Sequence, residues 1–165
     1  MAIEPLRNIL KNANTPQNTM ELAIETFGRI GPPASVVTSD LIQLVGAEGQ
    51  DGGIVEDALR ALGKIKGDPD QIVPILIEFG LQREEFYLKY AAVDALGDMG
   101  PDVKKARRGG EALDQLEKMG EALLRRAEEI KMLIDPQQQK LWLYNGFRLI
   151  LYGTTSFRYL QFLLN

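Results

Sequence analysis

Apolar residues recur along the first two thirds of the chain at steps of four and three, which is the period of one helix face. The clearest stripe falls on positions 23, 27 and 30, and it returns at 58, 62, 65 and at 92, 96, 99. A glycine and a proline follow each stripe, and these residues end one helix and begin the next. Further apolar runs at 36–45 and 72–79 predict a second helix after each of the first two stripes.

The stripes belong to a sequence motif that occurs three times, at 23–32, 58–69 and 92–101. Its central glycines, Gly28, Gly63 and Gly97, are 35 and 34 residues apart. A spacing in the thirties is typical of one helix–turn–helix unit per repeat. We expect these glycines to let neighbouring helices approach each other closely.

Three further glycines are expected to end the helices, namely Gly31, Gly67 and Gly100. Glycine adopts the left-handed backbone conformation of a helix end without steric cost. The glycine pair at 109–110 is expected to interrupt any helix that reaches it.

The motif resembles the short HEAT-like repeats first noted in phycobilisome lyases and found widely in bacterial scaffold proteins. The similarity is clearest over 58–79, where Ala-Leu-x-Ala-Leu-Gly-x-Ile precedes Gly-Asp-Pro and Ile-Val-Pro-x-Leu-Ile. It covers about residues 20–105 and implies an all-α fold, an α-solenoid of antiparallel helix pairs. It implies no single activity, because one fold supports many functions.

Some chemistries of HEAT-like families can be compared with this chain directly. The deoxyhypusine hydroxylases hold iron with His–Glu pairs, and this chain contains no histidine. The alkylpurine DNA glycosylases use a basic groove, which a net charge of −4 does not favour. Bilin lyases stay open as an alternative, although none of their catalytic residues can be placed on this sequence.

The chain is predicted to form a single domain with four parts. They are an N-terminal capping helix and loop at 1–18, three repeats at 19–108, a long amphipathic helix at 111–134, and an aromatic helical segment at 136–165. The absence of a signal-like N-terminus and of 18 consecutive apolar residues favours a cytoplasmic location.

The composition excludes several of the residue types that are most often used in catalysis. The chain has no cysteine and no histidine, which excludes thiolate nucleophiles, Cys-ligated metals and the commonest general base. No catalytic residue, cofactor or metal is therefore expected. Asp94, Asp98 and Asp102 step by four, but this spacing is also common on solvated helix surfaces.

A basic cluster follows the third repeat and consists of Lys104, Lys105, Arg107 and Arg108. It could bind a phosphate or an acidic partner. The favoured interpretation is a solvated helix end whose charges are balanced by nearby acids, Glu111, Asp114 and Glu117 among them. The acidic net charge also argues against nucleic acid as a partner.

The segment 136–165 is the most unusual part of the chain. It has three basic and no acidic residues, and it holds seven of the twelve aromatic residues. It could cap the solenoid as core, bind a partner, or lie at a membrane surface, which is the least favoured of the three. The candidate partner-binding residues are Trp142, Tyr144, Phe147, Arg148, Phe157, Arg158, Tyr159 and Phe162.

These observations favour a non-enzymatic protein–protein interaction scaffold or adaptor subunit, with another protein as its partner. Two alternatives remain open. One is a chromophore-handling factor similar to the phycobilin lyases, and the other is a peripheral subunit of a membrane-associated complex that docks through its C-terminal segment.

Overall fold

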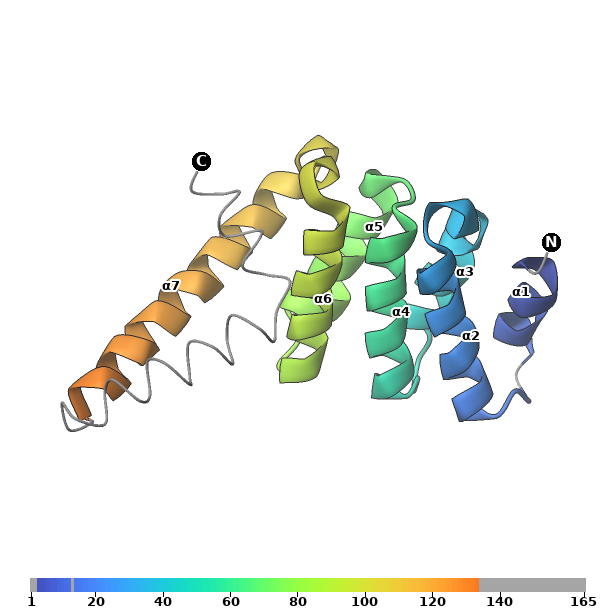
Figure 1. Cartoon of the computed structure of the whole chain (residues 1–165), viewed down its shortest axis with the longest axis horizontal. Coiled ribbons are helices and arrows are strands. Elements are labelled where there is room, and N and C mark those ends of the chain that lie inside the picture. Colours follow the sequence, from blue (N-terminus) through green and yellow to red (C-terminus); the bar gives the residue numbers. More distant parts are fainter. Residues whose placement is uncertain (1–2, 13, 134–165) are drawn as a thin grey trace. The chain divides into compact units, whose positions relative to one another are not determined.

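A computed structural model of the chain describes residues 3–12 and 14–133 (Figure 1). It contains two compact units, Met1–Ala112 and Leu113–Asn165. Every regular element in the described ranges is helical, which confirms the all-α prediction for this part of the chain.

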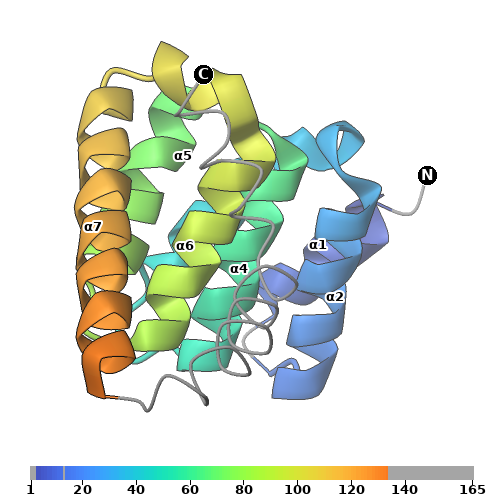
Figure 2. The same ribbon diagram turned by 60° about the vertical axis from the view of Figure 1, so that its left-hand side comes forward.

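Three long helices of the first unit lie side by side in one layer: α2 (Gln17–Ile30), α4 (Gly52–Ile65) and α6 (Phe86–Met99). Both views show the order α2, α4, α6, and the neighbouring helices are in contact (Figures 1 and 2). A short helix, α1 (Ile3–Lys11), packs on α2, so the predicted N-terminal helix is present.

Shorter elements connect these helices. The 3₁₀ helix η1 (Pro32–Val37) leads into α3 (Thr38–Val45), and α5 (Pro69–Leu76) continues into the π-helical turn η2 (Ile77–Leu81). Because α3 packs on α4, and α5 on both α4 and α6, the two short helices form a second row beside the long ones. The predicted second helices at 36–45 and 72–79 coincide with these elements.

The three copies of the motif fall on α2, α4 and α6, and their apolar stripes form the core of the first unit. Asp51 and Asp68 cap the N-termini of α4 and α5 by accepting hydrogen bonds from backbone amides. The largest fully buried side chains are Ile24, Phe27, Val37, Leu41, Leu59, Leu62, Ile65, Ile72, Leu76, Ile77, Leu96 and Met99.

Two of the three central glycines lie where neighbouring helices meet. A Cβ atom on Gly28 would lie 3.4 Å from the Cα of Ala61, and one on Gly63 only 2.4 Å from the Cα of Ala95. The prediction of close approach is confirmed at these two positions. At Gly97 no described atom outside its own helix lies within 4 Å of such a Cβ.

The helix-ending glycines agree with the structure at two positions out of three. Gly31 and Gly100 have φ angles of 72° and 59°, whereas α4 ends on Lys66 with φ 51°. The prediction for Gly67 is therefore wrong. Gly67 serves a different purpose, since a Cβ there would lie 2.6 Å from the hydroxyl oxygen of the buried Thr38.

After α6 the chain forms the 3₁₀ helix η3 (Gly100–Lys105) and then α7 (Gly109–Leu133), close to the long helix predicted at 111–134. The glycine pair starts α7 and does not interrupt it, which corrects the prediction. The reason is contact with η3, because a Cβ on Gly109 would lie 2.0 Å from the carbonyl oxygen of Val103.

We expect Gly63→Ala to lower the free energy of unfolding by about 1–3 kcal/mol, since the backbone of Ala95 must move to admit the methyl group. Gly28→Ala, with its 3.4 Å contact, should change stability less. Urea denaturation at low protein concentration measures both.

The matched control is Gly97→Ala, at the same position of the third repeat. It should raise the free energy of unfolding by about 0.5–1 kcal/mol, because alanine restricts the unfolded chain more than glycine. Equal losses at positions 63 and 97 would contradict the prediction.

Candidate functional site

Three aromatic side chains lie partly in solvent at the start of α6, and we call Phe86, Tyr87 and Tyr90 the aromatic cluster. They are 64%, 43% and 41% exposed, respectively. The rings of Phe86 and Tyr90 pack on each other, with centroids 5.2 Å apart and planes tilted by 56°. These residues were not among those predicted from the sequence, although three aromatics within five positions are a usable signal.

The two preceding long helices carry different residues at the corresponding positions. Shifted by the repeat spacing, Phe86 corresponds to Gly52 and Gln17, and Tyr90 to Glu56 and Glu21. Of the three repeats, only the third therefore has exposed aromatic rings at these positions.

Tyr87 connects the aromatic cluster to the neighbouring helix. A Cβ on Gly52 would lie 2.3 Å from the Tyr87 hydroxyl oxygen, so the ring is seated on the first turn of α4. This contact holds one ring in place while the Phe86–Tyr90 pair projects from the first turns of α6.

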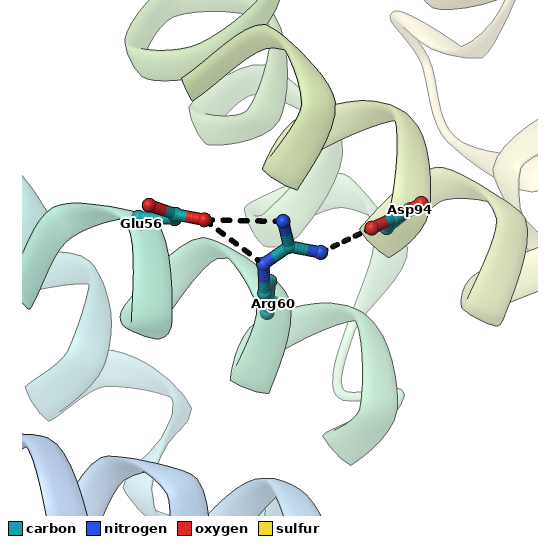
Figure 3. A network of polar contacts seen from close by, with 3 residues as sticks. All are labelled: Glu56, Arg60 and Asp94. Carbon is teal, nitrogen blue, oxygen red and sulfur yellow. Dashed lines mark hydrogen bonds and ion pairs between the residues drawn. The ribbon is translucent and has the colours of Figure 1, made fainter. Parts of the chain in front are cut away.

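A polar network joins α4 to α6 beside this contact (Figure 3). The guanidinium of Arg60 donates to Glu56 Oε1 from Nε at 3.3 Å and from Nη2 at 3.1 Å. Its Nη1 donates to Asp94 Oδ2 on the neighbouring helix. Burial lowers the pKa of Arg60, but the hydrogen bonds to Asp94 and Glu56 more than offset it and leave the pKa raised. The network therefore acts as a charged link between two repeats.

The three aspartates that step by four do not form one site. Asp94 binds Arg60, and Asp102 accepts a hydrogen bond from a lysine of the basic cluster at 2.6 Å. Asp98 is partly buried, and burial raises its pKa despite the opposing field of Lys64. Among the described residues, no group of three or more acidic side chains could hold a metal ion.

Most residues of the basic cluster contact acidic neighbours. Lys105 pairs with Asp102, and Arg108 donates twice to the Glu111 carboxylate, both times at 2.8 Å. The backbone amide of Arg107 donates to a carboxylate of α5 at 2.8 Å. These contacts favour the interpretation of the cluster as a solvated helix end.

A cavity of about 350 Å³ lies among α1, α2, α3 and the start of α4. Apolar and polar residues line it about equally, and Lys11 is the one charged residue among the described side chains that do so. It brings together no pair of groups suited to acid–base work. Within 3–12 and 14–133, no helix is long and apolar enough to cross a membrane.

The candidate partner-binding residues from Trp142 to Phe162 lie outside the described residues, so that prediction stays a prediction. Comparison of the chain with protein-family models, with curated proteins and with solved structures found no match. The function must therefore be inferred from the surfaces of the chain itself.

The Arg60–Asp94 pair should couple α4 to α6 measurably. We expect a double-mutant cycle of Arg60→Ala and Asp94→Ala to give a coupling of about 0.5–1 kcal/mol in urea denaturation, the upper range for partly exposed pairs. The more exposed Lys105–Asp102 pair is the matched control and should show a smaller coupling. Equal couplings for both pairs would count against the link between repeats.

The pKa of Asp57 is raised by partial burial and by the nearby carboxylates of Glu21 and Glu56. Because the folded pKa lies above the unfolded one, the ionised carboxylate weakens the fold above the folded pKa. We expect Asp57→Asn to raise the free energy of unfolding at pH 7 by about 0.5 kcal/mol or less, since water screens this half-exposed group. The gain should vanish as the pH falls below the ordinary pKa of aspartate.

Asp102→Asn is the control with the opposite sign, because Lys105 lowers the pKa of Asp102. That stabilisation exists above the unfolded pKa and is lost as the pH falls through the folded one. The variant should therefore be less stable than the wild type at pH 7. The same sign for both variants would show that the assigned causes are wrong.

Proposed function

We propose that the chain is a non-enzymatic protein–protein interaction scaffold, built as a short α-solenoid of HEAT-like helix pairs. Support comes from the placement of the three motif copies on neighbouring helices and from the glycine-mediated contacts between them. In such a stack each repeat contacts its neighbours, which leaves the outer faces available for binding.

The observation that carries this function is the aromatic cluster on α6. Phe86 and Tyr90 are both exposed, and their rings pack side by side. Aromatic residues are enriched at protein interfaces, where they supply large contact area at a low cost in conformational entropy. The cluster therefore marks a surface suited to a protein partner.

The charged residues of the first unit also fit a binding role better than a catalytic one. The charges of Arg60, Asp102 and Arg108 are paired with opposite charges of neighbours within the chain. Groups committed to such pairs contribute to the shape and rigidity of the scaffold. The C-terminal aromatic residues stay a proposed second binding region, and the cytoplasmic location stays a prediction.

The test is affinity capture from a lysate of the native source with the full chain immobilised. We expect the wild type to retain a partner protein and Phe86→Ala/Tyr90→Ala to retain at least tenfold less. Trp142→Ala tests the second region in the same way. Leu22→Ala is the control, since Leu22 is 61% exposed but lies on α2, away from the aromatic cluster.

Circular dichroism would verify that the variants stay folded, since substitutions of exposed side chains usually change stability little. If all variants captured the partner equally well, the aromatic cluster would not be part of the binding surface. Failure of the wild type to retain any protein would count against the scaffold itself.

A further inference from the structure

Four residues of α6 form a single stripe: Phe86, Tyr90, Val93 and Gly97. Their spacing of four, three and four places them on one helix face. By repeat register this stripe corresponds to the face of α4 that contains Gly63 and receives α6. On α6, Phe86 and Tyr90 are exposed, Val93 is half-buried, and no described atom of another element approaches Gly97.

The stripe continues an established helix–helix interface, but its surface has a different shape. Where α4 carries Gly52 and Glu56, the stripe carries two aromatic rings, so a neighbour must offer a recess to accept them. At the other end of the stripe, Gly97 has no side chain, and no described atom outside its own helix lies within 4 Å of where its Cβ would be, so a ring can approach the helix backbone there. Rings at one end and a glycine at the other make the stripe complementary to itself when its direction is reversed.

We propose that the stripe binds a second copy of this chain, with the two α6 helices antiparallel about a two-fold axis. Phe86 then lies over Gly97 of the second copy, and Tyr90 packs against Val93 of the second copy. A spacing of four, three and four brings antiparallel helices together in such layers. Two-fold pairs of this kind are the commonest form of homo-oligomer, and each contact occurs twice.

The proposed contact is small. From Phe86 to Gly97 the stripe extends about 17 Å along the helix, given a rise of 1.5 Å per residue. This length buries less surface than a stable interface of standard size. We therefore expect a reversible dimer with a dissociation constant of about 10 μM or weaker. The inference rests on the proposed function, because it names the partner of the same aromatic surface.

Because the chain has no cysteine, single cysteines can report the register. Under mild oxidation at ~100 μM, a mixture of full-length Phe86→Cys and Gly97→Cys chains should give a disulfide-linked dimer. Either variant alone should give at least tenfold less. In an antiparallel pair the two copies of position 86 lie about 17 Å apart, and a disulfide requires Cα atoms within about 7 Å.

A second measurement uses no cysteine. Analytical ultracentrifugation of the wild type should show the average mass rising toward that of a dimer between ~1 and ~300 μM. Val93→Glu should stay monomeric, and Leu22→Glu, which adds the same charge on α2, should behave as the wild type.

Each other outcome overturns the inference. Cross-linking of Phe86→Cys alone would show a parallel arrangement, and a wild type that is monomeric at all concentrations would show no self-association. A monomeric wild type that Val93→Glu destabilises would show that the stripe is covered within one chain. If self-association fails while lysate capture still depends on Phe86, the proposed function stands with another partner. If self-association and lysate capture both fail, the inference and the proposed function are both refuted.

Discussion

The backbone contact of α4 with α6 at Gly63 is the constraint on which the first unit depends. With no side chain at Gly63, the Cα of Ala95 can approach to a distance that any Cβ would prevent. The same close spacing lets Arg60 reach Asp94. Tyr87 can rest on the first turn of α4 because Gly52 also lacks a side chain. The contact between α4 and α6 thus depends on two glycines of α4, Gly63 and Gly52.

Local signals in the sequence were sufficient for most of the fold. Helical periodicity, prolines and a recurring glycine predicted the long helices and the contact at Gly63. The error at Gly67 arose from following residue type and not repeat register. Shifted by 35 residues, Gly31 corresponds to Lys66, and Lys66 is the residue with the left-handed conformation. Register was the better guide, because the packed repeats set where each helix must end.

The candidate site was harder to predict, since exposure is a property of the packed chain. The periodicity of α6 resembles that of α2 and α4, and nothing in it distinguishes a covered face from an open one. The three aromatics within 86–90 are visible in the sequence, but only the structure shows that Phe86 and Tyr90 are exposed. The Arg60–Asp94 pair, in contrast, could have been foreseen, because its partners are one repeat apart.

The third copy of the motif differs from the first two at exposed positions of its helix. Interior repeats must accept their neighbours, so their faces are restricted to residues such as Gly63 and Glu56 that fit the next helix. A solvated helix face is usually polar, since exposed apolar surface favours association. On α6 the corresponding positions hold Phe86 and Tyr90, and the glycine is retained at position 97. Exposed rings together with a glycine on the same face are features suited to contact with another helix.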